Sequence, residues 1–430
     1  MSVLVLNRNP LGPFPYNRWL SGYEGHIVVI APRDRIELMG EQVPLDNLGY
    51  KHLEILSSFD DEKHLVNVAT ELAHAYGVRY VLTHRDADLS IAARLRQDLG
   101  LDGPWPEDVL AFRDKAVMKA RARAAGIPVA EHVVPLGPED VGRFAADQGY
   151  PIVLKRRDGY NSIGQQIIHD EPALRRALKA MEGSTDWLAY LVEAFVPGKM
   201  CHVDGLVLDG RTVLAWPSQY QYSLSSYATD RGPRIDLTLG PDDPLTGRLL
   251  EFTLRVLAAL RPAVRMPHHA FHAEIFHTPH DQLVLCEIAA RPGGAKVREV
   301  IGGLFDVDLA EAVSRATVGL PVPVLESVRR GEPLPKPKCM GGQVLLMKRP
   351  GLVRSLPALP QHDWLTSFSY FVKVGQRMAG ATGSADFMVG AVGMAANRAE
   401  CESRLRALGE YLASSIEVEE APVQTGAPGN

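Results

Sequence analysis

The sequence has 430 residues, of which 46% are hydrophobic and 23% are charged. These proportions are typical of a soluble globular protein, and the length indicates more than one domain. The formal net charge of −5 is spread without blocks of like charge, which disfavours a nucleic-acid-binding protein. The four cysteines lack metal-binding or redox spacing, the N-terminus lacks a signal-peptide pattern, and no apolar run approaches the roughly 20 residues of a membrane span. We therefore expect a soluble cytoplasmic protein with no nucleic-acid or membrane partner.

Strand and helix patterns alternate over the first hundred residues. The expected strands are 3–6, 26–30 and 80–83, and the expected helices are 62–76 and 91–99. Such alternation predicts a parallel sheet covered by helices on both faces. The first strand leads into residues 7–15 without a G-x-G-x-x-G loop, so a dinucleotide-binding domain is disfavoured.

A helix and a hairpin follow a proline-bearing linker at residues 103–106. Asp114 occupies the N-cap position of a helix predicted over 115–125. The strands 151–155 and 165–169 form a predicted hairpin, joined by a polar loop that contains glycines.

Two lysines stand where they could meet phosphate groups. Lys115 opens the predicted helix, and Lys155 ends the strand just before the loop 156–164. Backbone amides and the Ser162 hydroxyl of this loop could close over phosphates, although the P-loop pattern is absent. Taken alone, the same residues also fit a charged hairpin tip.

The segment YLVEAFVPG at residues 190–198 reads as a strand that breaks at a turn. It carries Glu193 and ends at Pro197-Gly198, which predicts a hinge between domains. The exposed backbone of such a hinge could pair with an adenine edge. An ordinary edge strand meeting a turn is the alternative.

The hairpin at residues 270–289 suggests a metal site. Period-two alternation puts His272 and Glu274 on one face of the first strand, and a turn centred on 280–281 places Glu274 opposite Glu287. Facing like charges destabilise a hairpin, and a hard divalent cation bound between them would remove that penalty. The alternative is a solvent-facing strand pair with two surface glutamates.

The R-P-G-G sequence after this hairpin strengthens the metal interpretation. Arg291 follows Glu287 by four residues and can hold an anionic oxygen. Gly293 and Gly294 let backbone amides approach an anion closely.

Residues 216–239 are polar and weakly periodic, and they predict an active-site loop. Substrate-binding candidates in and near this loop are Tyr220, Tyr222, Tyr227, Arg231, Arg234 and, one helical turn beyond Gly294, Arg298. A second linker is expected over 326–338. Strands at 343–348 and 368–374, a helix at 399–414 and a flexible tail at 421–430 complete the chain.

In their order, these pieces resemble the ATP-grasp superfamily over about residues 105–420. The motifs that carry the resemblance are DKAVMKARARAAGIPV, YPIVLKRRDGYNSIGQQ, YLVEAFVPG, HVDGLVLDG and FHAEIFHTPHDQLVLCEIAARPGG. The ending E-I-A-A-R-P-G-G is most similar to the L-amino-acid (dipeptide) ligase or carboxylate–amine ligase branch, which also resembles biotin carboxylase. The resemblance implies an α/β fold with a parallel-sheet pre-ATP-grasp domain (1–105), a lid subdomain and hinge (106–196), a catalytic subdomain (197–335) and a C-terminal α+β subdomain (336–420).

The resemblance also implies roles for individual residues. ATP phosphates would be bound by Lys115, Lys155 and Ser162, and adenine by Glu193 and the backbone near Val196 and Gly198. Magnesium, or manganese in its place, would be held by Glu274 and Glu287. Arg291 would stabilise an acyl-phosphate and the following tetrahedral intermediate. His272 would orient a substrate, which Gly293, Gly294, Tyr222 and Arg298 would contact.

Three positions depart from the superfamily pattern. Met200 stands where a ribose-binding glutamate is common, Ala289 where many relatives have a metal-binding asparagine, and Arg156 where proline often follows the lysine. Alanine at the second position is tolerated in the amino-acid-ligase branch.

The function implied is an ATP-dependent ligase that activates a carboxylate as an acyl-phosphate, joins it to an amine and releases ADP and phosphate. An amino acid or small peptide is the expected substrate, with Asp204 and His272 as candidate bases, and a homodimer is left open. The alternatives are a biotin-carboxylase-type enzyme, a synthase of purine or cofactor metabolism, and a non-catalytic ATP-binding regulatory protein.

Overall fold

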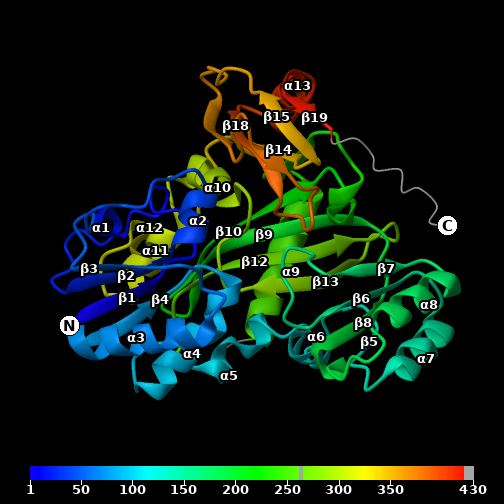
Figure 1. Cartoon of the computed structure of the whole chain (residues 1–430), viewed down its shortest axis with the longest axis horizontal. Helices are drawn as coiled ribbons and strands as arrows, with labels where there is room; N and C mark the ends of the chain where they lie inside the picture. Colours follow the sequence, from blue (N-terminus) through cyan, green and yellow to red (C-terminus); the bar gives the residue numbers. More distant parts are fainter. Residues whose placement is uncertain (261–264, 421–430) are drawn as a thin grey trace, which may run out of the picture.

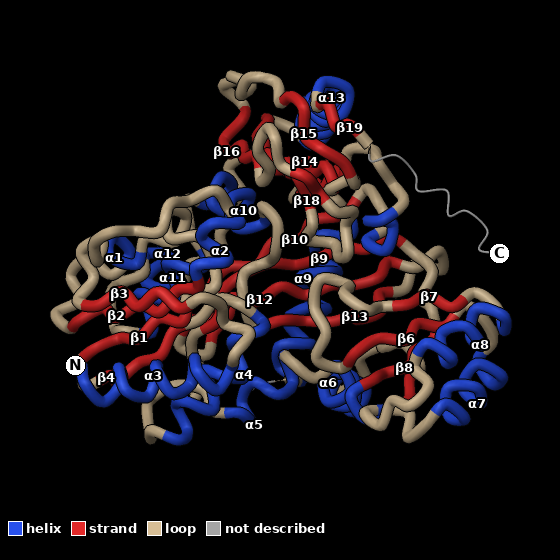
Figure 2. The backbone as a smooth tube through the Cα atoms, viewed as in Figure 1, coloured by secondary structure: helices blue, strands red, loops and turns tan. Residues whose placement is uncertain are grey.

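The computed structural model describes residues 1–260 and 265–420, so the predicted tail at 421–430 lies outside the described residues (Figure 1). The strands form four sheets, of which an eight-stranded sheet lies at the centre (Figure 2). Among the described residues, no helix has both the length and the apolar character that crossing a membrane requires.

The first hundred residues form a four-stranded parallel sheet, as predicted. Its strand order is β3-β2-β1-β4, with β1 at Ser2–Leu6, β2 at His26–Pro32, β3 at His52–Leu56 and β4 at Val78–Leu82. Helices α3 (Glu62–Tyr76) and α4 (Asp86–Asp98) pack on one face, while α1 (Tyr16–Trp19), α2 (Arg33–Leu38) and Ala310 of α11 (Leu309–Thr317) cover the other. The sequence analysis missed β3, which is only partly buried apart from Leu56 and gives no clear apolar run.

A second, smaller four-stranded sheet follows, with the order β5-β8-β6-β7. It consists of β5 (His132–Val133), β6 (Ile152–Arg156), β7 (Gln166–Ile168) and β8 (Tyr190–Ala194), and it packs against α7 (Pro138–Gln148) and α8 (Glu171–Ala180). The predicted hairpin is β6–β7. The predicted helix is α6 (Lys115–Ala124), preceded by the short α5 (Pro106–Val109), and the Asp114 side chain accepts hydrogen bonds from two backbone amides at its N-terminus.

The central sheet has the order β13-β12-β9-β10-β11-β14-β18-β16. Its strands are β9 (Lys199–Leu208), β10 (Arg211–Tyr220), β11 (Arg234–Thr238), β12 (His269–His277), β13 (Leu283–Ala289), β14 (Met340–Met347), β16 (Leu365–Tyr370) and β18 (Phe387–Ala395). Strands β14, β16 and β18 of residues 336–420 thus continue this sheet, and the division of the chain at 105, 196 and 335 stays a prediction. A three-stranded sheet of β15 (Gly351–Ser355), β17 (Arg377–Met378) and β19 (Glu417–Glu419) lies beside it.

Helices cover the two faces of the central sheet differently. Helix α9 (Pro244–Ala259) packs with α6 on one face, through the core that contains Val203 and Ala273. The other face packs against α10 (Val297–Phe305), α11 and α12 (Pro323–Arg329) through Leu206 and Ala270. Helix α13 (Arg398–Ser415) packs farther along, on β11, β14 and β18. The expected linker 326–338 begins inside α12, which ends at Arg329.

The expectation that residues 216–239 form a loop is wrong in part. Strand β10 extends to Tyr220, a short helix spans Leu224–Ala228, and β11 begins at Arg234, so only the middle of the segment is a loop. The strands of segment 216–239 do not show the apolar pattern of a buried strand, because polar residues such as Asp236 and Thr238 are buried there and form hydrogen bonds.

Candidate active site

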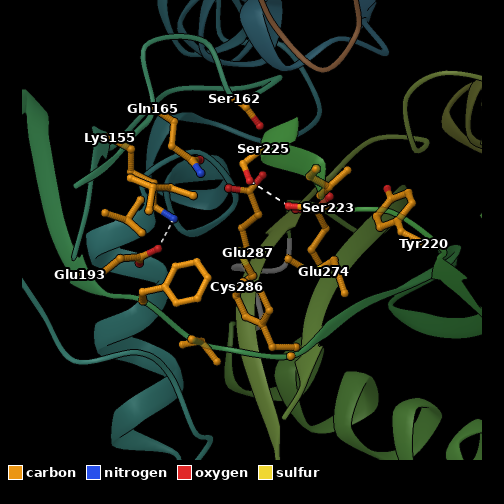
Figure 3. A pocket seen from close by; sticks show the side chains of 18 of the residues that line it. Lys155, Ser162, Gln165, Glu193, Tyr220, Ser223, Ser225, Glu274, Cys286 and Glu287 are labelled. Atoms are coloured by element: carbon orange, nitrogen blue, oxygen red, sulfur yellow. Dashed lines mark hydrogen bonds and ion pairs between the residues drawn. The ribbon is translucent and has the colours of Figure 1, made fainter. Parts of the chain in front are cut away.

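A cavity of about 560 Å³ lies between the small sheet and the central sheet (Figure 3). Many of the sequence-predicted residues line it, namely Lys115, Lys155, Ser162, Glu193, Val196, Gly198, Tyr222, Glu274 and Glu287. The residues described around the cavity do not include the predicted His272, Arg291, Gly293, Gly294 and Arg298. The structure thus brings the expected nucleotide and metal residues together with Tyr222, while the other expected substrate and catalytic residues lie outside this lining.

Glu274 of β12 pairs directly with Glu287 of β13, as the sequence predicts. The register shifts beyond this pair, where Ile275 pairs with Leu285 and Cys286 becomes the extra residue of a β-bulge. Bulges re-aim side chains, and the Cys286 side chain lines the cavity. Burial raises the pKa of its thiol to about 12, so the thiol is protonated at neutral pH.

Each of the two glutamates has a cationic neighbour. Lys115 Nζ lies 3.1 Å from Glu287 Oε2, and His272 Nε2 lies 3.6 Å from Glu274 Oε1. Burial alone would raise the pKa of Glu287, but Lys115 and Lys155 outweigh it and lower that pKa. Both carboxylates are therefore oxygen donors that suit a hard divalent cation.

Lys115 connects three parts of the site. Besides Glu287, its Nζ contacts the carbonyl oxygen of Gly159 at 2.5 Å, in the loop between β6 and β7. This loop takes left-handed backbone conformations at Asn161 and Ser162 and contacts the C-terminal region, where the Ser384 amide donates to the Asn161 carbonyl at 2.9 Å.

Glu193 is buried between two lysines. Its Oε1 lies 2.5 Å from Lys155 Nζ and its Oε2 lies 3.0 Å from Lys119 Nζ (Figure 3 shows the first pair). Burial alone would raise the pKa of Glu193, but the two lysines lower it to about 2. The predicted acceptor role of Glu193 toward adenine stays a prediction, since a carboxylate oxygen that pairs with one lysine can accept a further hydrogen bond. The sequence analysis missed Lys119, which follows Lys115 by one helical turn.

We expect Glu193→Gln to destabilise the protein at neutral pH, because it leaves two buried lysines without their counter-charge. Breaking a buried ion pair in this way costs about 3–5 kcal/mol. Since the folded-state pKa of Glu193 is depressed from 4.5 to about 2, its contribution is present above pH 4.5 and is lost as the pH falls toward 2. Thermal melts at pH 7 and pH 3 should therefore show a smaller gap between wild type and variant at pH 3. Glu131→Gln, which removes an exposed ion pair, is the control. An equal difference in melting temperature between wild type and Glu193→Gln at both pH values would contradict the depressed pKa of Glu193.

Arg291 is held by a residue of the N-terminal sheet. Its Nε bonds to Asp86, the first residue of α4, and its Nη1 donates to the carbonyl oxygen of Pro292 at 2.7 Å. Burial would raise the pKa of Asp86, but Arg291 and Arg113 outweigh it and lower that pKa. The sequence analysis missed Asp86, whose signal is its place at the carboxyl end of a parallel strand, β4.

Arg298 contacts other parts of the protein in the structure, and its predicted role toward a substrate carboxylate stays a prediction. Its Nη1 donates to the carbonyl oxygen of Pro13 at 2.9 Å, and its guanidinium lies 3.4 Å from Asp308 and 4.1 Å from the ring centre of Phe14. These contacts join α10 to the N-terminal region.

Arg231 and Arg234 also contact other residues of the protein. Arg231 pairs with Glu420 at 2.6 Å. Arg234 is fully buried, bonds to Ser226 Oγ at 2.9 Å and lies 4.0 Å from the ring centre of Tyr222. Arg234 therefore shapes the loop that places Tyr222 at the cavity.

His272 and Asp204, the candidate bases, are paired with each other. His272 Nδ1 lies 2.9 Å from Asp204 Oδ1, and both side chains are buried. Burial would lower the pKa of His272, but Asp204 outweighs it and raises that pKa to about 9. His272 is thus held by Asp204, and its role as a base stays a prediction.

Close packing explains two of the predicted glycines. A Cβ on Gly293 would lie 2.6 Å from Asp204 Oδ1, and a Cβ on Gly198 would lie 2.4 Å from the carbonyl oxygen of His277. Gly198 also has φ +151, in the region that favours glycine.

Known proteins resemble this chain in sequence and in fold. No family model matches it. An L-arginine-specific L-amino acid ligase of Bacillus subtilis is 25% identical over 276 residues, which cover 63% of this chain and 65% of that protein. The chain thus matches less than two thirds of that relative's length. N5-carboxyaminoimidazole ribonucleotide synthase of Mycobacterium tuberculosis is 35% identical over 91 residues, 21% of each chain.

Solved structures match nearly the whole chain. An L-amino acid ligase of Bacillus licheniformis superposes with a TM-score of 0.75 at 15% identity, over 98% of this chain and 99% of that one. The biotin carboxylase domain of Hydrogenobacter thermophilus 2-oxoglutarate carboxylase, in complex with MgADP and bicarbonate, gives a TM-score of 0.70 at 15% identity, over 97% and 90%. These likenesses show that the chain has the ATP-grasp fold.

Proposed function

We propose that the chain is an ATP-dependent carboxylate–amine ligase. It activates a carboxylate as an acyl-phosphate, joins it to an amine and releases ADP and phosphate. The observation that carries the proposal is the facing pair Glu274 and Glu287, which shares one cavity with Lys115 and Lys155. An amino acid or small peptide is the proposed substrate, supported by the likeness to amino-acid ligases in both sequence and structure.

The cavity offers a separate set of groups to each part of ATP. Lys115, Lys155 and the Ser162 loop would meet the phosphates, and the backbone of residues 194–198 would meet the adenine edge. Glu274 and Glu287 would hold magnesium, or manganese in its place, since both cations accept oxygen ligands. When bound, such a cation neutralises charge on the transferring phosphoryl group.

The chain's own residues would act in sequence. Lys115 and Lys155 offset the negative charge that the nucleotide brings into a partly buried site. The loop 156–164 covers the cavity and excludes water, which would otherwise hydrolyse the acyl-phosphate. Arg291 stabilises the carbonyl oxygen as the amine attacks, and phosphate leaves with its electron pair.

Product analysis tests the proposal. Purified protein, magnesium and ATP are incubated with pools of amino acids, and ADP release and product masses are measured with and without each pool. We expect ADP release that depends on the added substrates, and a product equal to acid plus amine minus water. A product that has gained one carboxyl group would indicate a carboxylase, and ATP binding without ADP release in any pool would indicate a regulatory protein.

A further inference from the structure

A buried chain of polar contacts leads from Glu274 into the central sheet. His272 lies between Glu274 and Asp204, with its Nε2 3.6 Å from Glu274 Oε1 and its Nδ1 2.9 Å from Asp204 Oδ1. The second oxygen of Asp204 lies 2.5 Å from His202 Nδ1. These side chains come from the neighbouring strands β12 and β9 and point to the same face of the sheet.

This series of polar contacts continues across three more strands. His202 Nε2 lies 3.0 Å from Asp236 Oδ2 on β11, and Gln343 Nε2 on β14 donates to the same oxygen at 2.9 Å. Strand β10 lies between β9 and β11, and its register places the small Ser218 beside His202. A large side chain at Ser218 would block the passage from His202 to Asp236.

The far end of this series of polar contacts lies close to the R-P-G-G turn. Gln343 Oε1 accepts a hydrogen bond from the backbone amide of Lys296 at 2.8 Å, and Lys296 is the N-cap residue of α10, which this turn precedes. The middle of the chain touches the turn as well, because Gly293 packs against Asp204 so closely that a Cβ would lie 2.6 Å from Oδ1. The turn 291–294 is therefore attached to the same polar chain that begins at Glu274.

Stability alone does not account for this arrangement. His202, Asp204, Asp236 and Gln343 are each at most 3% exposed. Burying charged groups is costly, and apolar side chains of similar volume often stabilise a protein as well or better. A paired polar network does, however, fix its members in one geometry.

We propose that His202, Asp236 and Gln343 are positioning residues, which hold the turn 291–294 at a fixed place relative to the Glu274 carboxylate. The inference rests on the proposed function, in which the cation held by Glu274 acts on the phosphoryl group of the acyl-phosphate and Arg291 acts on its carbonyl oxygen. These three side chains do not line the cavity, so they act through the turn and through Asp204.

Gln343→Leu tests the proposal because it removes both the bond to Asp236 and the bond to the Lys296 amide, two residues after the turn. Thr238→Val is the matched control, because Thr238 is buried in the adjoining strand and exchanges two hydrogen bonds with Gly341, at 2.9 and 3.0 Å, outside the polar chain. We expect both variants to lose similar thermal stability. Only Gln343→Leu should lower kcat, by ~10-fold or more, with the Kd for ATP changed by less than about threefold, because misplacing reacting groups slows the chemical step.

Hydrogen exchange gives a readout that needs no turnover. In the nucleotide-free protein, the amides of residues 293–297 should exchange ~10-fold faster in Gln343→Leu than in wild type, and should be unchanged in Thr238→Val. Equal effects of the two variants on kcat, or unchanged exchange in Gln343→Leu, would overturn the inference.

Two further variants test the positioning role of Gln343. If Gln343→Leu does not fold, Gln343→Met, whose unbranched side chain follows the path of glutamine more closely, removes the same two hydrogen bonds and should show the same changes. Combined with Arg291→Lys, Gln343→Leu should have less than its full effect on kcat, because both act through the same turn. If wild type releases no ADP with any substrate, the proposed function fails while the exchange comparison still decides the positioning role.

Discussion

Replacing Glu274 and Glu287 together by glutamine is expected to reduce ADP formation at least about 1,000-fold, because removing a single charge-stabilising group already costs ~100- to 1,000-fold. The two carboxylates face each other on β12 and β13, and glutamine keeps their shape while removing the charge that binds a cation. The variant should fold with lower stability, since the change removes the repulsion between the two carboxylates but also the ion pair between Glu287 and Lys115.

Steady-state ADP release over a range of magnesium concentrations, with thermal melts alongside, measures this effect. Glu251→Gln, at an exposed position on α9, is the control and should keep full turnover. Normal turnover in the double variant would exclude the hairpin as the metal site.

Arg291→Lys is expected to lower turnover by about 100-fold while leaving the affinity for ATP nearly unchanged. Arg291 lies outside the residues that line the cavity, and its charge is most valuable when the carbonyl oxygen becomes negative during amine attack. Lysine can keep an ion pair with Asp86, but it lacks the planar fork that bonds Asp86 and the Pro292 carbonyl together.

Turnover at saturating ATP, set beside ATP titrations, separates the two contributions. Arg298→Lys is the matched control, because this arginine lies on the neighbouring helix and contacts Pro13 and Asp308 instead of the site. It should lose stability and keep turnover. Tenfold weaker ATP binding with normal turnover in Arg291→Lys would show that Arg291 serves the nucleotide.

The sequence predicted the facing glutamates correctly, although one premise was inaccurate. The expected turn was centred on 280–281 without a bulge, whereas the strands pair His277 with Leu283 and so centre the turn on residue 280. The bulge at Cys286 restores the register, so that Glu274 still meets Glu287. Period-two alternation finds which residues share a face, but it cannot detect two offsets that cancel.

Contacts between distant parts of the chain could not be predicted from one sequence. Asp86 and Arg291 are separated by 205 positions, and Pro13 and Arg298 by 285. Residue spacing identifies neighbours within one helix or hairpin. It does not distinguish which of the arginines near the site would bind a substrate. The lysine pair on Glu193 was hidden for the same reason, because Lys119 comes from α6 and Lys155 from β6.

The bond between Arg291 and Asp86 limits how freely parts of this protein can be exchanged. Protein engineers often treat the N-terminal unit of a multidomain enzyme as a cassette that can be replaced by a homologous one. Here a replacement would have to offer a buried acidic residue at the start of its last helix, aimed at an arginine of the recipient. A chimera that lacks this residue would leave Arg291 without its buried counter-charge and would misalign its guanidinium.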